Sequence, residues 1–335
     1  MADGKKISPL FLIIIVAISL SAPSEVKGEG SWVYVVNQGE DTLSVIDATT
    51  LVNIATIKLS GSGAYAPYPT PGGKFVYIPK TGSNDISLVD VETLKEVKVI
   101  STGEPKPYAL TFTFDGRSIY IVHLESEVIS IADGIKREVV NSLRLVDSPA
   151  PVLFNRRATR FYLGSRSEGG LSAIYTKSGE TINTLSVEGG TRELRFTPDF
   201  RDVWVLGETN LTVTDVKKNK VIKIIPLNGS NGHDYSMAMD PKGKRIYLAR
   251  AEDSAISVID TRRYRELDKI VLDGPVYDIA ISRPDGRYLW VAGEGVVWAI
   301  DLGSNREVAS IPVGKGPQRL AFVTLRRDAS FACFQ

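Results

Sequence analysis

The sequence predicts an all-β protein, a seven-bladed β-propeller with four-stranded blades, and three observations support that prediction. A stretch rich in aromatic and β-branched residues, WVYVVN at 32–37, returns six more times along the 335 residues. The third residues of the copies are 42 or 43 residues apart: Tyr34, Tyr77, Tyr120, Tyr162, Trp204, Tyr247 and Trp290. None of the copies has the periodicity of an amphipathic helix. A strand-built repeat of this length is typical of propeller blades.

Each repeat contains the same predicted strands in the same order. The aromatic strand is followed by a second strand such as LSVID at 43–47, a third such as NIATIKL at 53–59, and an innermost strand such as YALTFTF at 108–114. Six second strands end in aspartate, which we expect to accept hydrogen bonds from the turn that follows: Asp47, Asp90, Asp133, Asp215, Asp260 and Asp301. Thr176 replaces this aspartate in the fourth repeat, so that turn should be the least regular.

The phase of the repeat predicts how the ring closes. The first repeat begins on an aromatic strand, and the last repeat finishes on an innermost strand at 318–324. The last strand must therefore complete the first blade, which removes the open edges of a linear array. This organisation predicts a propeller at 29–324 and a tail at 325–335.

The N-terminal residues 1–28 resemble a signal peptide. A basic start, MADGKK, precedes an apolar run from Leu10 to Ala22 and small residues suited to cleavage. The alternative is an uncleaved anchor, but the run is short for a span of about 20 residues. We expect an exported protein, periplasmic, cell-surface or extracellular, with no stable membrane span after cleavage.

Composition narrows the function classes. With 40 basic and 39 acidic residues, the net charge of +1 gives no electrostatic indication of binding to nucleic acid or an acidic membrane. The single cysteine, Cys333, excludes an intramolecular disulfide and a cysteine metal cluster. No nucleophile elbow, Walker loop or dinucleotide fingerprint occurs. Catalysis is therefore not predicted, although an enzymatic role stays open.

The repeat resembles the YVTN family of β-propellers over about residues 32–324, through strands such as WVYVVN and LSVID and an innermost strand ending like FDGR. This resemblance implies the propeller fold. Similar repeats occur in archaeal surface-layer proteins and in propeller subunits of quinone-dependent amine dehydrogenases. They also occur in the haem-binding propeller of cytochrome nitrite reductases and in its haem-maturation homologues.

A candidate ligand site follows from aligning the first residues of the innermost strands, which should surround the channel mouth. The alignment gives Tyr65, Tyr108, Ala150, Arg192, Tyr235, Asp278 and Gln318. Tyrosines with a few charged groups suit a small ligand, and a solvent-filled funnel is the alternative. Loops on the same face should bring His123, Arg166, Arg250, Glu252 and Asp253 near it.

Histidine is scarce, which bears on any haem or metal site. His123 ends the third aromatic strand, whereas His233 precedes the sixth innermost strand and is the best candidate for an axial ligand if the protein is associated with haem. No CxxCH attachment motif occurs.

The sequence favours a non-catalytic binding or scaffold protein without a cofactor, and we expect a monomer. Its expected partner is another exported protein or a small molecule, not nucleic acid. The alternative is a haem-associated propeller of a nitrite-reductase-like system or a haem maturation factor. A lactonase-type or amine-dehydrogenase subunit is a third class, for which the sequence offers no partner chain or carboxylate cluster.

Overall fold

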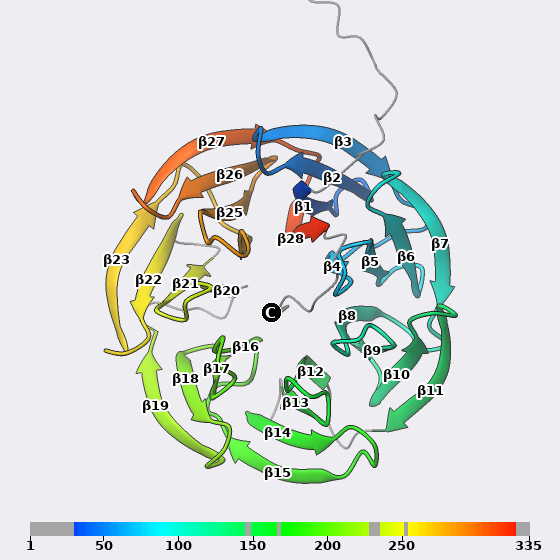
Figure 1. Ribbon diagram of the computed structural model, residues 1–335, viewed down its shortest axis with the longest axis vertical. Helices are drawn as coiled ribbons and strands as arrows, with labels where there is room; N and C mark the ends of the chain where they lie inside the picture. The colour runs from blue at the N-terminus through cyan, green and yellow to red at the C-terminus, as the bar shows by residue number, and fades with distance from the viewer. Residues whose placement is uncertain (1–29, 145–148, 166–168, 228–234, 251–253, 326–335) are drawn as a thin grey trace, which may run out of the picture.

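The computed structural model describes residues 30–144, 149–165, 169–227, 235–250 and 254–325. These residues form seven four-stranded antiparallel sheets arranged as blades in a ring (Figure 1). Among them there is no helix long and apolar enough to cross a membrane. The predicted fold class is confirmed.

Blades 1 to 4 each run from an innermost strand at the channel to an outermost strand. Blade 1 contains β28 (Pro317–Leu325), β1 (Gly30–Asn37), β2 (Thr42–Asp47) and β3 (Val52–Lys58). Blade 2 contains β4 (Tyr68–Pro69), β5 (Phe75–Lys80), β6 (Asp85–Asp90) and β7 (Lys95–Ser101). Blade 3 contains β8 (Pro107–Phe112), β9 (Ser118–His123), β10 (Val128–Asp133) and β11 (Glu138–Arg144). Blade 4 contains β12 (Pro149–Phe154), β13 (Arg160–Ser165), β14 (Gly170–Tyr175) and β15 (Thr181–Ser186).

Blades 5 to 7 have the same arrangement. Blade 5 contains β16 (Glu193–Phe196), β17 (Asp202–Leu206), β18 (Asn210–Asp215) and β19 (Lys220–Pro226). Blade 6 contains β20 (Tyr235–Met239), β21 (Arg245–Arg250), β22 (Ala255–Asp260) and β23 (Arg265–Val271). Blade 7 contains β24 (Asp278–Ile281), β25 (Tyr288–Gly293), β26 (Val296–Asp301) and β27 (Arg306–Pro312).

The ring closes as the repeat phase predicts. Strand β28 pairs with β1 from Gly30↔Leu325 to Asn37↔Pro317, so the last strand becomes the innermost strand of blade 1. The hydroxyls of Ser31 and Thr324 lie 3.1 Å apart across this pairing. The strand runs to Leu325, one residue beyond the expected end of the propeller.

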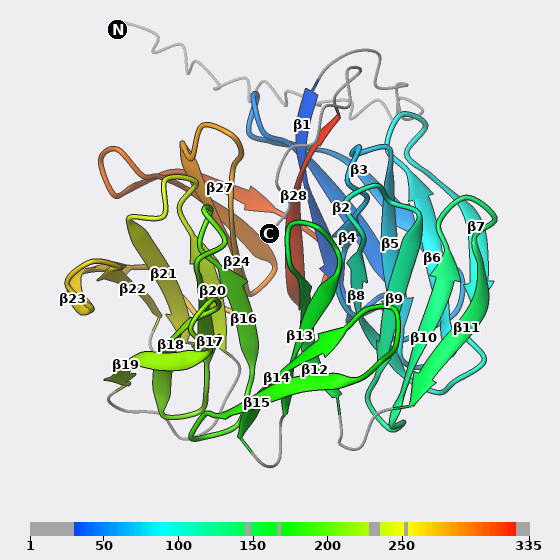
Figure 2. The same ribbon diagram turned by 60° about the horizontal axis from the view of Figure 1, so that its bottom comes forward.

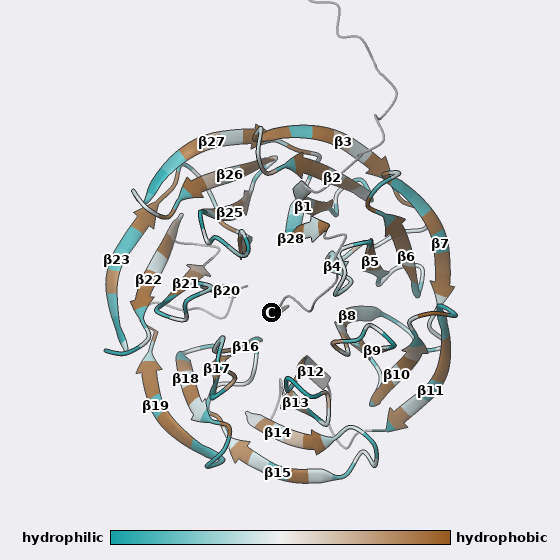
Figure 3. Cartoon of the chain, viewed as in Figure 1, coloured by the Kyte–Doolittle hydropathy of each residue, from teal (hydrophilic) through white to brown (hydrophobic). Residues whose placement is uncertain are grey.

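The repeated aromatic residue lies in the packed layer between blades. All seven copies are buried, with exposed fractions between 0% and 4%, and neighbouring blades pack their β-branched residues around them. The residues of the outermost strands are instead mostly exposed. Hydrophilic and hydrophobic residues are mixed along these strands (Figure 3). Burial between sheets therefore explains why the aromatic position recurs.

The six strand-end aspartates stabilise their turns as predicted. Oδ1 of Asp47, for example, accepts hydrogen bonds from the backbone N–H groups of Thr49 and Thr50, both at 2.8 Å. The prediction for blade 4 was misplaced by one residue. Arg160 pairs with Tyr175, just as Trp32 pairs with Asp47, so Tyr175 and not Thr176 occupies the aspartate position.

The ring has two different faces (Figure 2). We call the turn face the side that carries two kinds of hairpin. One joins the innermost strand to the aromatic strand in blades 2 to 7, and the other leads to the outermost strand in every blade; both have four to six residues. The loop face carries the other connections, up to nine residues long at 59–67. Gly30 and Leu325, the first and last described residues, both lie at the turn face.

Candidate functional site

A cavity of about 790 Å³ occupies the centre of the ring. Its lining extends from Tyr65 and Tyr108, near the loop face, to Lys74 and Arg117 in turns at the other face. Its wall comes from the innermost strands, which surround the centre of the ring (Figure 1). Each of these strands runs from the loop face to the turn face. A concave site of this volume is large enough for a small organic ligand.

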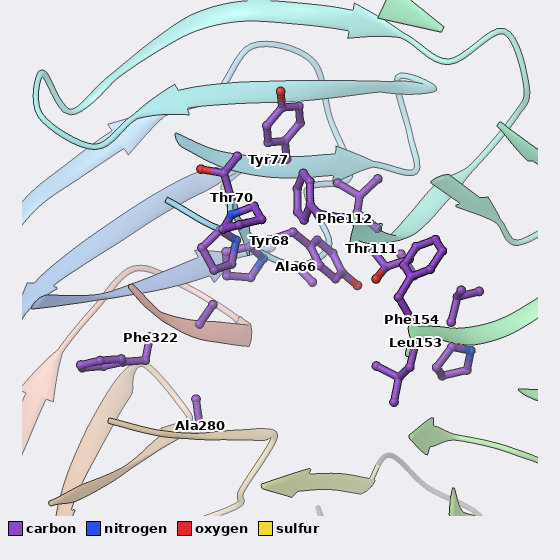
Figure 4. Close-up of a pocket in the computed structure, with 18 of the residues that line it drawn as sticks. Ala66, Tyr68, Thr70, Tyr77, Thr111, Phe112, Leu153, Phe154, Ala280 and Phe322 are labelled. Atoms are coloured by element: carbon purple, nitrogen blue, oxygen red, sulfur yellow. The ribbon is translucent and has the colours of Figure 1, made fainter. Parts of the chain in front are cut away.

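Two levels of side chains form most of the wall. Strand pairing places one residue of each innermost strand at the same level, opposite the residue two positions after the repeated aromatic residue. We call this level the mouth ring: Ala66, Ala109, Pro151, Glu193, Ser236, Asp278 and Arg319. All of them line the cavity except Ser236, which is fully buried. The inner ring lies two residues further along each strand: Tyr68, Thr111, Leu153, Arg195, Ala238, Ala280 and Ala321. Figure 4 shows Tyr68, Thr111, Leu153 and Ala280 around one space.

The predicted alignment of the innermost strands was one residue early in six of the seven blades. Glu193 pairs with Leu206, Asp278 with Ala292 and Arg319 with Val36, so only Asp278 was placed at its true level. Bulges beside Tyr108 and before Asn37 disrupt the register that the sequence suggests. Because side chains alternate in direction along a strand, a slip of one residue exchanges the wall-facing set for its neighbours.

The predicted site residues are therefore only partly brought together. Tyr65, Tyr108, Arg192 and Asp278 all line the cavity, whereas Gln318 does not and Arg319 takes its place. Arg192 is paired with Glu208 on the loop face. His233, Arg166, Glu252 and Asp253 lie outside the described residues, as do the side chains of Ala150, Tyr235 and Arg250.

Consecutive blades are linked at the mouth ring by side chains that accept a backbone hydrogen bond from the next blade. Glu193 Oε2 accepts from the N–H of Met237 at 2.6 Å, and Asp278 Oδ2 accepts from the N–H of Leu320 at 2.8 Å. Ser236 Oγ accepts from Ile279 at 3.3 Å. These three bonds join blades 5, 6, 7 and 1 in sequence.

Both carboxylates in this arc also have an arginine partner. Glu193 pairs with Arg195, and Asp278 Oδ1 lies 3.2 Å from Nη1 of Arg319. Burial raises the pKa of Glu193 although Arg195 opposes the shift. The arc of Glu193, Arg195, Asp278 and Arg319 therefore offers donors and acceptors to the cavity in a partly desolvated setting.

The opposite wall, from blades 2 to 4, is apolar and aromatic. Ala66, Pro151 and Leu153 line it, and the rings of Tyr65 and Tyr108 meet edge to face with centroids 5.8 Å apart. The hydroxyl of Tyr68 donates to the carbonyl of Tyr108 at 3.3 Å, and burial raises the pKa of Tyr68, so this hydroxyl remains protonated. The cavity thus has a polar side and an apolar side.

The sequence did not identify Tyr68, Glu193, Arg195 or Arg319 as site residues. Glu193 and Arg195 stand in the segment RELRFTP at 192–198, and their alternation with the apolar Leu194 and Phe196 is the signal that could have placed them on the channel wall. Tyr68 lies in a strand of only two residues, where no such pattern exists.

His123 does not belong to this site, contrary to the prediction that it lies near the channel mouth. It is fully buried within blade 3, where Nδ1 lies 3.0 Å from the carbonyl oxygen of Pro105 and Nε2 lies 3.0 Å from Ser130 Oγ. Burial lowers its pKa, which keeps the ring neutral. The residue satisfies buried polar groups and does not contact the cavity.

The described residues contain no cluster of three or more histidine, cysteine, aspartate or glutamate side chains placed to hold a metal ion. The cavity lining contains no histidine among them either. The described part of the wall can therefore bind a ligand through hydrogen bonds, ion pairs and apolar contact.

Comparison with known proteins agrees with this architecture. Among solved structures, the chain is similar to hydrazine synthase of Kuenenia stuttgartiensis, with 20% identity over 84% of this chain and 92% of that chain, and a TM-score of 0.67. It is also similar to NirN, a dihydro-heme d1 dehydrogenase solved in complex with DHE, with 19% identity over 88% of this chain and 67% of that chain, and a TM-score of 0.63. At these identities the likeness shows the fold alone.

Family-level comparison is more specific. The search of curated proteins gives no match. The model of a propeller family, however, matches residues 9–326, nearly the whole chain. The chain belongs to the YNCE-like beta-propeller family.

Proposed function

We propose that this protein is a non-catalytic binding protein that takes a small amphipathic ligand in its central channel. The observation that carries this proposal is the two-sided wall of the 790 Å³ cavity. A polar group of the ligand would meet Arg195 and Arg319, while its apolar part would lie against Tyr68 and Leu153. The loop face, at the mouth, is then free to meet a protein partner.

The residues of the wall favour a channel that binds a ligand over a channel with a purely structural role. A channel that only closes the ring needs no ion pairs in its half-buried wall, because such pairs cost desolvation free energy and can be replaced by apolar packing. Small residues at Ala238, Ala280 and Ala321 also keep the inner ring open on the side of the arginines.

A bulky substitution in the inner ring tests channel binding. The probe is 8-anilinonaphthalene-1-sulfonate, whose rings and sulfonate match the two sides of the wall. Ala280→Phe should weaken its binding by about tenfold or more in a fluorescence titration, because the new ring fills the cavity. Ser310→Phe, which adds the same ring on the outermost strand β27, is the control and should leave binding unchanged. Equal affinities for all three proteins would contradict the proposal.

A haem-associated role is the second candidate. One similar structure is named for haem d1 chemistry, and His233 precedes β20, whose residues Ala238 and Met239 line the cavity. The described residues of the lining do not include a histidine, so a histidine ligand to the iron would be His233. If bound, haem would contribute its iron chemistry, while Arg195 and Arg319 could pair with its carboxylates.

An absorption spectrum with native mass spectrometry on protein from the native host separates the two candidates. A Soret band and a matching mass excess, both lost in His233→Ala, would favour the haem role. A featureless spectrum with a different bound mass, or none, would favour the cofactor-free binding protein.

We also infer that the protein is exported and that the leader at 1–28 is cleaved, from the basic start and the apolar run that follows. N-terminal sequencing of protein from the native host should find a start close to Glu29. Recovery of chains that begin at Met1 would contradict cleavage.

A further inference from the structure

Charge is separated between the two faces of the ring. The hairpins of the turn face, between the described strands, carry sixteen lysine and arginine residues but six aspartate and glutamate residues. The described connections of the loop face carry three basic and nine acidic residues. The two faces therefore have opposite charge, although the whole chain has a net charge of only +1.

The positive charge of the turn face is accessible. Fourteen of its sixteen basic side chains are exposed; Arg137 and Arg283 are half-buried. The strand-end aspartates add negative charge there, but Lys95, Lys220 and Arg265 begin the strands that follow and compensate for part of it. The excess of basic residues remains when these flanking positions are included.

The basic residues are distributed over a broad ring. They come from six of the seven blades, and the exception is blade 1, where Gly30 and Leu325 lie. Because every hairpin on this face is short, none extends far beyond its neighbours. A broad positive disc matches a planar anionic surface better than a strand of nucleic acid, which proteins bind with a narrower stripe or groove.

We infer that the turn face docks on a membrane surface rich in anionic lipid headgroups. Each lysine or arginine near such a surface adds to the attraction, and the effect decays over a Debye length. The chain enters the propeller at Gly30 on this same face, directly after the leader and its apolar run. While the leader remains in a bilayer, it would therefore hold the turn face towards the lipid.

This docking would also orient the channel. Lys74, Arg117 and Arg283 surround the end of the cavity at the turn face. The channel would then open towards the headgroups, and the acidic loop face would point away from the membrane. This inference depends on the charged faces and not on the proposed ligand.

Sedimentation with lipid vesicles tests the inference on the full-length chain. Vesicles of phosphatidylcholine mixed with phosphatidylglycerol should bind the protein, and added salt should weaken that binding. Lys217→Glu with Arg262→Glu, both at exposed turns, should reduce the partition coefficient by about tenfold or more. The control, Lys106→Glu with Lys315→Glu, makes the same change of charge on the loop face and should bind like wild type.

Three results would overturn the inference. In the first, the turn-face variant binds anionic vesicles as well as wild type does. In the second, wild type binds pure phosphatidylcholine vesicles equally well, which would assign binding to the apolar run. In the third, anionic vesicles do not bind while heparin retains wild type more strongly than the turn-face variant, which would indicate an acidic polymer or protein as the partner.

Discussion

The aspartates at the turns and the glutamate in the channel wall accept the same kind of hydrogen bond in opposite surroundings. Asp301 accepts from the N–H of Ser304, three residues away, on an exposed surface. Glu193 accepts from the N–H of Met237, 44 residues away, in the half-buried channel wall. The hydrogen bond lowers the pKa of Asp301, whereas burial raises the pKa of Glu193.

This comparison shows that the turn aspartates stabilise single hairpins, whereas Glu193 stabilises the contact between two blades. A turn aspartate can be lost with little effect beyond its own hairpin, since water can replace it. The loss of Glu193 leaves a buried N–H in the next blade and an arginine without its partner. A carboxylate acceptor therefore contributes more to the stability of the fold where it connects two blades than where it lies in a single turn.

Removing Glu193 should have the largest effect. Glu193→Ala is expected to lower the free energy of unfolding by about 3 kcal/mol, because it leaves the buried N–H of Met237 without its acceptor and the half-buried Arg195 without its carboxylate partner. Asp47→Ala, which removes two hydrogen bonds in an exposed turn, should cost about 1 kcal/mol. Urea unfolding measures both. If the alanine variant does not fold, Glu193→Gln keeps an acceptor for Met237 and should still cost more than Asp47→Ala; equal costs would remove the distinction.

The pH dependence of stability should have opposite signs for the two groups. Burial raises the pKa of Glu193 in the folded chain above the ordinary value of 4.5, so the folded chain keeps this proton to a higher pH than the unfolded chain does. The free energy of unfolding therefore falls as the pH rises from about 4.5 through the folded pKa. Asp301 has a folded pKa below 3.8, so its contribution is present above 3.8 and is lost as the pH falls through the folded value. Thermal unfolding of Glu193→Gln and Asp301→Asn against wild type, from about pH 3 to about pH 7, should show differences that change in opposite directions. If both differences changed in the same direction with pH, Glu193 and Asp301 would not differ in burial as described.

Placing the missing aspartate in blade 4 should have the smallest effect. Tyr175→Asp supplies the acceptor that the other six turns have, but removes the ring that lies under Arg160 at 5.5 Å. The first change is worth about 1 kcal/mol and the second about 0.5 kcal/mol, so a gain of a few tenths is expected. Tyr175→Asn, which offers a similar acceptor without the charge, is the matched comparison. A clear loss of stability in both variants would show that this turn differs from the others.

The sequence predicted the fold closely because the fold depends on periodicity. A repeat of 42 or 43 residues around Tyr34 and its copies determines blade number, strand order and closure by the last strand. These features are predicted correctly even when the alignment of the repeats is wrong by one residue. The aspartate position of blade 4, misassigned to Thr176, shows the size of that error.

The channel wall does not tolerate the same error. Side-chain direction reverses with every residue, and bulges next to Tyr108 and Asn37 change the register without a clear mark in the sequence. The bulge at Asn37 explains why Arg319 was passed over in favour of Gln318. In blade 5, where the pairing has no bulge, the one-residue slip of the alignment put Arg192 in the place of Glu193. The opposite charges of the two faces were also hidden, because basic turns and acidic loops alternate along the chain and cancel in the total.

Because β28 closes the ring, the propeller can complete its folding only when synthesis of the chain is nearly finished. A ribosome releases Ser31 early, but Thr324, its partner across the first blade, follows 293 residues later. Until then blade 1 lacks its innermost strand and blades 7 and 1 have no complete interface. A nascent chain can assemble internal blades in turn, yet the cooperative ring forms only after the last segment emerges. Such long-range pairing is slow, so the unfinished first blade is where a chaperone would have most to protect.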